Sequence, residues 1–85
     1  ATMREQVGAL IRHHRDRAGL TQTDLAEKIG IAPETVSRLE RGTFAPSFDT
    51  LVDLATALGV SVRDFFELAT DQSEMIEKIR SLISW

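Results

Sequence analysis

Cysteine is absent from this 85-residue chain, and so is tyrosine. Without cysteine the chain has no disulfide framework and no thiolate metal site. No apolar run approaches the ~20 residues of a membrane-spanning helix, and no signal-peptide pattern opens the chain. We therefore expect a small cytoplasmic protein without membrane association, folded around one hydrophobic core.

Positive charge is also scarce, which excludes a uniformly basic surface for nucleic acid. The formal net charge is −3, from 13 acidic and 10 basic side chains. The imbalance is local, because residues 1–41 hold seven basic and six acidic side chains, whereas residues 42–85 hold three and seven. A DNA-binding protein needs positive charge only where phosphates lie. The N-terminal half is therefore compatible with DNA binding, and the C-terminal half is acidic.

The two prolines and five glycines, with short polar caps, divide the chain into short helices. Thr2-x-x-Glu5 and Thr21-x-x-Asp24 are capping-box patterns, and Pro33 suits the first turn of a helix. Further helix starts are predicted at Ser47, Ser61 and Asp71, and helix ends at Gly19, Gly30, Gly42 and Gly59. No strand-type alternation persists. The expected fold class is all-α, with short loops in a compact bundle.

Residues 22–41 have the pattern of a helix-turn-helix, two short helices that cross steeply over a tight turn. Ala26 is small enough to let the second helix approach, and Gly30 permits the turn. The shared apolar contact comes from Leu25, Ile29, Ile31, Val36 and Leu39. Together these residues predict that the helix over 33–41 is held by one apolar side and exposes the other.

The exposed side of this second helix is polar. At 100° per residue, Glu34, Ser37, Arg38 and Arg41 fall within one arc opposite Val36 and Leu39. Arg38 can bond guanine O6 and N7, and Glu34 can accept from a cytosine amino group. Gln22 begins the preceding helix, where its amide and free backbone N–H groups can hold a phosphate.

Glu34 has other interpretations. It is four residues before Arg38, so the two can form an ion pair that merely supports the helix by about 0.2–0.5 kcal/mol. Because a carboxylate near phosphates is unfavourable, Glu34 can also serve to orient Arg38 or to exclude wrong bases. These alternatives remain open at the level of the sequence.

The run from Gly19 to Phe66 resembles the Cro/lambda-repressor-type helix-turn-helix domain, the xenobiotic-response-element family of bacterial and phage regulators. The matching features are Gly19-Leu20-Thr21-Gln22, Leu25-Ala26, Gly30, Ser37-Arg38-Leu39-Glu40-Arg41-Gly42, Pro46, Leu51, Leu54-Ala55 and Leu58-Gly59-Val60. The resemblance covers about residues 4–68. It implies a five-helix domain over residues 1–70, recognition helix 33–41, and operator binding as a dimer.

The resemblance also implies roles for individual residues. The expected DNA-binding residues are Gln22, Thr23, Pro33, Glu34, Thr35, Ser37, Arg38, Arg41 and Thr43. Family members pair an arginine at the position of Arg15 with a glutamate at the position of Glu40, as a structural ion pair. The sequence departs from the family at Ala32-Pro33, where a Ser or Thr often caps the recognition helix. We therefore expect no DNA contact from the side chain of residue 32.

Other residues that attract attention have ordinary explanations. His13 and His14 are adjacent on a helix, so they point about 100° apart and cannot share a metal ion. We expect His14 to be partly buried, and Phe65 and Phe66 to fill the core. No catalytic triad spacing, phosphate-binding glycine loop or metal-ligand cluster occurs. We expect neither an enzyme nor a cofactor.

The segment 71–85 is predicted to form a C-terminal amphipathic helix. Its apolar stripe consists of Met75, Ile76, Ile79, Leu82 and Ile83. Because the core of the family domain is complete before this helix, the stripe needs a partner. We expect it to pair with the same helix of a second chain in a two-fold dimer; the alternative is that it folds back on its own domain.

The sequence thus favours a sequence-specific regulator that binds double-stranded DNA as a homodimer, most simply a repressor of a palindromic operator. Two alternatives stay open. One is an antitoxin-like regulator that also binds a protein partner through its acidic half. The other is a protein-interaction domain that has lost DNA binding.

Overall fold

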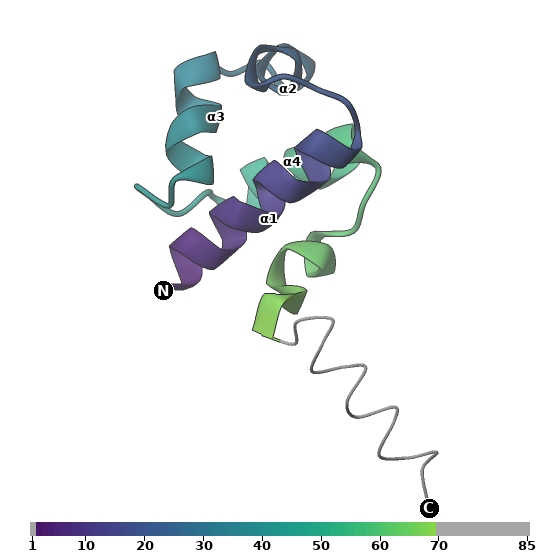
Figure 1. Ribbon diagram of the computed structural model, residues 1–85. Coiled ribbons are helices and arrows are strands. Elements are labelled where there is room, and N and C mark those ends of the chain that lie inside the picture. The colour runs from purple at the N-terminus through teal and green to yellow at the C-terminus, as the bar shows by residue number, and fades with distance from the viewer. Residues whose placement is uncertain (1, 70–85) are drawn as a thin grey trace, which may run out of the picture.

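The computed structural model describes residues 2–69, and all the regular structure in that range is helical. The elements are α1 (Met3–Arg17), α2 (Gln22–Ile29), α3 (Pro33–Glu40), α4 (Phe48–Leu58) and the 3₁₀ helix η1 (Val62–Ala69). Figure 1 shows α1 crossing the middle of the molecule, with α2 and α3 on one side and η1 on the other. The helix predicted over 71–85 lies outside the described residues.

Within residues 2–69, the helices begin where the sequence predicts them to begin. Thr2 and Thr21 each accept a hydrogen bond from the backbone N–H three residues on, and Glu5 and Asp24 bond back to complete both capping boxes. Ser47 caps α4 by accepting from the N–H of Thr50 at 3.1 Å. The boundaries follow from these local bonds, which is why the sequence alone could locate them.

The fifth helix differs from the other four because η1 is a 3₁₀ helix, so the expected five-helix domain consists of four α-helices and one 3₁₀ helix within residues 2–69. Asp64 closes its first turn with an N–H bond to the Ser61 carbonyl at 3.0 Å, while its carboxylate accepts from the Ser61 N–H at 2.9 Å. Three residues per turn place Val62 and Phe65 on the same side. Phe65 is fully buried, but Phe66 is 46% exposed, so its expected place in the core is wrong.

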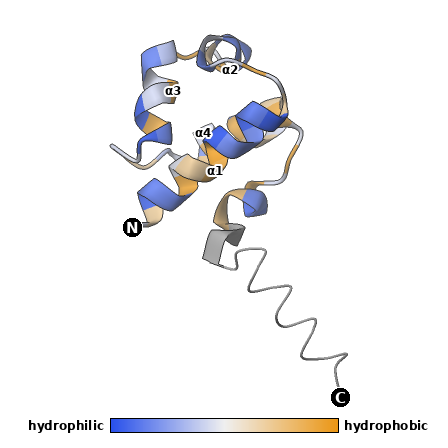
Figure 2. Cartoon of the chain, in the orientation of Figure 1, coloured by the Kyte–Doolittle hydropathy of each residue, from blue (hydrophilic) through white to orange (hydrophobic). Residues whose placement is uncertain are grey.

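One hydrophobic core joins all five elements. Its buried members are Val7, Ile11, Leu25, Ala26, Val36, Leu39, Leu51, Leu54, Ala55, Leu58 and Phe65. Hydrophilic residues colour much of the outer side of α2 and α3 (Figure 2). His14 is half-buried and its ring packs edge-on against Phe65, with the ring centroids 6.0 Å apart. None of the helices in residues 2–69 is long and apolar enough to span a bilayer.

The crossing of α1 over α3 depends on a glycine in the middle of α1. A Cβ on Gly8 would lie 2.4 Å from the Leu39 carbonyl oxygen and 2.6 Å from that of Glu40. The main chain of α1 therefore rests directly on the last turn of α3, with no side chain between them. This contact fixes the position of α3 and was not predicted from the sequence.

A second close approach follows at the end of α3. Gly42 adopts φ +72° and donates its N–H to the Leu39 carbonyl at 3.1 Å, while the Thr43 N–H reaches the Arg38 carbonyl at 3.1 Å. This is the Schellman arrangement that ends a helix at a left-handed glycine. A Cβ here would lie 2.7 Å from the Cα of Glu5, so α1 leaves no room for a side chain.

We predict that Gly8→Ala destabilises the protein by about 1–3 kcal/mol, because the added methyl group overlaps two carbonyl groups of α3. Helix propensity alone predicts the opposite sign, a gain of about 1 kcal/mol. Urea unfolding measures the difference. Ala9→Gly, on an exposed position of the same helix, is the control for propensity. A more stable Gly8→Ala variant would disprove the close approach.

Candidate nucleic-acid interface

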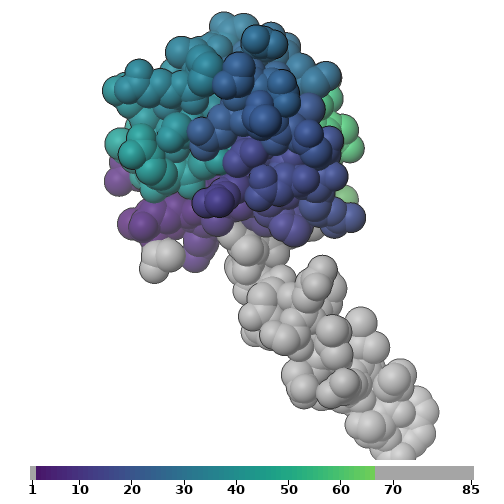
Figure 3. Space-filling model, turned by 45° about the horizontal axis from the view of Figure 1, so that its top comes forward, coloured from purple at the N-terminus to yellow at the C-terminus, as the bar shows by residue number. Residues whose placement is uncertain are grey.

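α2 and α3 form the predicted helix-turn-helix. Ala26 is fully buried, and Gly30 adopts φ +73° just past the end of α2. The Ile31 N–H bonds the Ala26 carbonyl at 3.0 Å and thereby closes the turn. Val36 and Leu39 hold the inner side of α3 in the core, at 0% and 1% exposure. In the space-filling view α2 and α3 form one continuous surface (Figure 3).

The outer side of α3 carries the polar arc that the sequence predicts. Glu34, Arg38 and Arg41 are exposed, and Ser37 is half-buried. Arg38 donates from Nη2 to Glu34 Oε1 at 3.0 Å, with the two side chains 52% and 73% exposed. The Arg41 Nε donates to the Ser37 carbonyl at 3.3 Å. One face of the helix thus carries an acceptor at Glu34 and donors at Arg38 and Arg41.

The two ends of α3 differ in how they are capped. Ala32 is the N-cap residue and makes no side-chain cap bond, because its methyl group cannot accept a hydrogen bond. Pro33 occupies the first turn. The Thr35 N–H instead bonds the Ala32 carbonyl at 2.9 Å. The helix ends at Glu40, one residue before the predicted end, with Arg41 as the C-cap. Pro33 and Thr43 lie exposed at opposite ends of the face.

A buried ion pair fixes α3 to α1. Arg15 donates from Nε to Glu40 Oε2 at 2.6 Å and from Nη2 to Glu40 Oε1 at 3.0 Å. The side chains are only 10% and 4% exposed. The hydrogen bonds that Arg15 donates to Glu40 raise the pKa of Arg15 further above its usual value, so the guanidinium stays charged. Arg15 Nη1 also donates to the Leu20 carbonyl at 2.9 Å.

Gln22 joins the same pair. Its Nε2 donates to Glu40 Oε1 at 3.0 Å, so the first residue of α2 is bonded to the last residue of α3. The sequence predicts a phosphate contact for Gln22 and does not predict this bond. No local pattern signals it, because residues 22 and 40 meet only after the two helices have packed. Glu40 therefore connects three helices through Arg15 and Gln22.

The N-terminus of α2 still offers donors to an anion. Its capping box uses the backbone N–H groups of Thr21 and Asp24. The N–H groups of Gln22 and Thr23 belong to the first helical turn and take no part in this box. The Thr21 hydrogen bonds hold the pKa of Asp24 below its ordinary value. The helix start is thereby fixed with two backbone donors left for a phosphate.

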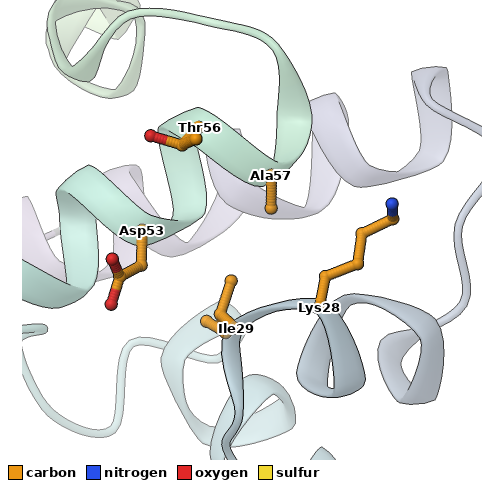
Figure 4. Close-up of a pocket in the computed structure, with 5 residues that line it drawn as sticks. All are labelled: Lys28, Ile29, Asp53, Thr56 and Ala57. Carbon is orange, nitrogen blue, oxygen red and sulfur yellow. The ribbon is translucent and has the colours of Figure 1, made fainter.

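An open groove of about 430 Å³ lies elsewhere, between α2 and α4. Lys28 and Ile29 line it from α2, and Asp53, Thr56 and Ala57 from α4 (Figure 4). None of the predicted DNA-binding residues lines it. Within residues 2–69, no three His, Asp or Glu side chains gather as a metal site would require. The residues Met75, Ile76, Ile79, Leu82 and Ile83 lie outside the described range.

Comparison with known proteins gives one consistent result. Residues 11–65 match the helix-turn-helix family. An HTH-type transcriptional regulator of Methanothermobacter thermautotrophicus is 43% identical over 63 residues, 73% of this chain and 91% of that protein. The regulator y4dJ of Sinorhizobium fredii is 40% identical over 72 residues, 85% and 90% of the two chains.

Two solved structures agree with this result. The clp gene regulator ClgR of Corynebacterium glutamicum superposes with a TM-score of 0.74 at 38% identity, covering 76% of this chain and 83% of that one. The restriction-modification controller protein C.AhdI of Aeromonas hydrophila superposes with a TM-score of 0.70 at 34% identity, covering 73% and 94%.

We predict that Glu40→Leu or Arg15→Met alone lowers the free energy of unfolding by about 3–5 kcal/mol, because each leaves a buried charge without its partner. The double variant Arg15→Met/Glu40→Leu should be less destabilised than either single variant. Arg17→Met is the control, since Arg17 is exposed on the same helix and its loss should cost at most about 1 kcal/mol. Additive losses in the double variant would show that the pair is not coupled.

Proposed function

The chain belongs to the Cro/C1-type helix-turn-helix family of transcriptional regulators, and we propose that it represses transcription by binding a palindromic operator as a dimer. The single observation that carries the proposal is the outer face of α3. Its polar side chains are exposed while its inner side is held by the core and by the Arg15–Glu40 pair. A helix so held can enter a major groove with its side chains in fixed positions.

The expected contacts divide into two kinds. Arg38 and Glu34 are the base-reading residues, at the centre of the exposed face. Gln22 and Thr23 bind phosphate at the start of α2, where backbone N–H groups are left by the capping box. Pro33, Thr35, Ser37, Arg41 and Thr43 complete the interface. In this proposal residues 1–70 form the DNA-binding domain, with the helix-turn-helix at 22–41.

Dimerisation is assigned to residues 71–85, on the strength of their apolar stripe in the sequence. Two copies would place their α3 helices in successive major grooves, about 34 Å apart. The bound dimer would act by occupying its operator. It would do so in the cytoplasm and without a cofactor. Removing residues 71–85 should yield a monomer in sedimentation experiments. If the truncated chain is still a dimer, the dimer interface lies within residues 1–70.

A specific observation favours a protein partner in addition to DNA. Phe48 is 71% exposed and Val52, one turn later on α4, is 39% exposed. Asp49 and Asp53 stand beside them on the same helix and are also exposed. An apolar pair beside two carboxylates suits a basic, partly apolar protein surface better than phosphates. An antitoxin-like regulator would use such a surface, and so would an interaction domain without DNA binding.

We expect a random-sequence duplex selection to recover a palindrome, and binding to that duplex to fall steeply with salt as counterions return to the phosphates. Arg38→Ala should relax specificity at one base pair per half-site at a cost of about 1–3 kcal/mol. Gln22→Ala should weaken binding to all sequences alike, because it removes the side-chain amide from the phosphate site together with the bond that this amide donates to Glu40.

The control for these variants is Arg12→Ala, which removes one exposed positive charge outside the interface. Equal loss on all sequences for Arg38→Ala would reassign that residue to a phosphate. If the selection recovers no duplex that binds saturably and with salt dependence, the chain is an interaction domain.

A further inference from the structure

Glu34 and Arg38 form an ion pair on the exposed face of α3, and this pair keeps hydrogen-bonding groups for a further partner. Arg38 Nη2 and Glu34 Oε1 are 3.0 Å apart. Arginine offers five N–H donors in a fixed plane, and one of them is used by Glu34. The guanidinium therefore keeps donors for a second partner while the carboxylate stays beside it. The pair presents two donors and one acceptor as a single surface.

A G·C base pair presents the complementary pattern in the major groove. Guanine shows two acceptors, N7 and O6, and cytosine shows the N4 amino donor next to them. An A·T pair shows an acceptor, a donor, an acceptor and then a methyl group. Only the G·C edge matches two donors followed by one acceptor. We infer that Glu34 and Arg38 read one G·C pair together, with Arg38 on guanine and Glu34 on cytosine.

The dimensions of the pair agree with this assignment. The 3.0 Å between Nη2 and Oε1 is close to the ~2.9 Å expected for the guanine O6–cytosine N4 hydrogen bond within the base pair. The side chains and the bases can therefore form two parallel rows of matched spacing. Both side chains are more than half exposed, so neither must leave a packed site to reach the groove.

The ion pair also explains how a carboxylate can stand in a groove lined by phosphates. Glu34 is neutralised by Arg38 at hydrogen-bond distance, so the pair enters the groove without net charge. Because the pair forms in the free protein, Arg38 is already restrained before it binds, which lowers the entropy lost on association. A lone glutamate at this position would be repelled, and a lone arginine would read guanine without testing cytosine.

This inference rests on the proposed function, because it specifies how the proposed interface selects bases. It assigns Glu34 a role in specificity that the helix-support interpretation does not require. A supporting residue would affect the stability of α3 and nothing at the cytosine. The two roles therefore predict different changes in binding affinity when one DNA base is chemically altered.

The test uses the duplex recovered by the random-sequence selection, with single base analogues at the G·C pair whose discrimination Arg38→Ala relaxes. 7-Deazaguanine removes the N7 acceptor. N4-methylcytosine replaces the amino hydrogen that faces the major groove. Inosine removes only the minor-groove amino group and is the control. Each analogue is placed in both half-sites.

For the wild-type protein we expect 7-deazaguanine and N4-methylcytosine each to weaken binding about 5- to 150-fold, the range for a lost base contact, and inosine to change little. Glu34→Ala should remain sensitive to 7-deazaguanine and become insensitive to N4-methylcytosine. Asp53→Asn, which removes one exposed carboxylate from α4, is the matched charge control and should respond to both analogues as the wild type does.

Two results would overturn the inference and leave the proposed function intact. One is an equal N4-methylcytosine penalty for the wild type and Glu34→Ala, which would confine Glu34 to helix support. The other is an A·T pair at the position that Arg38 discriminates. Failure of the proposed function has a different result, because the selection would then recover no binding duplex at all.

Discussion

The bidentate ion pair between Arg15 and Glu40 determines how the outer face of α3 is oriented in this molecule. Glu40 is the last residue of α3, so its two bonds to α1 fix the end of the helix and thereby its rotation. Gln22, the first residue of α2, donates a hydrogen bond to the same carboxylate. Within residues 2–69, no buried side-chain nitrogen or oxygen is left without a hydrogen-bond partner. A charged group in the core is tolerated because each of its polar atoms is satisfied.

The distribution of charge follows from this arrangement. Among residues 2–66, Arg15 is the one charged residue that is buried, at 8% exposure, and it is paired with Glu40, so it contributes little to the outer field. The exposed positive charges of the N-terminal half include Arg38 and Arg41, on the side where phosphates are expected. On α4, Asp53 lines the groove with Lys28 and Ile29, to which none of the predicted DNA-binding residues contributes. A slightly acidic protein can therefore present a local surface suited to DNA, because only the charges near the duplex act strongly through salt.

Much of the fold was predictable because its signals are local. Capping boxes at Thr2 and Thr21 and the inner positions of α3 depend on residues a few places apart, and the structure has them where the sequence puts them. What the sequence could not supply depends on residues far apart. Gly8 is informative only once the last turn of α3 lies against it, and the bond between Gln22 and Glu40 requires two packed helices. The exposure of Phe66 depends on 3₁₀ winding, which shifts the side chains relative to an α-helix.

The close approach at Gly8 has a consequence for how such proteins diversify. At Gly8, α1 contacts carbonyl groups of α3, which every residue type supplies. The side-chain bonds between the two helices are made by Glu40 and not by the outward residues of α3. The outward positions of α3 can therefore be exchanged without repacking the scaffold, provided that Val36, Leu39 and Glu40 are kept. The main-chain contact and the buried pair hold α3 independently of its outward side chains, so those side chains can change one at a time without loss of the fold.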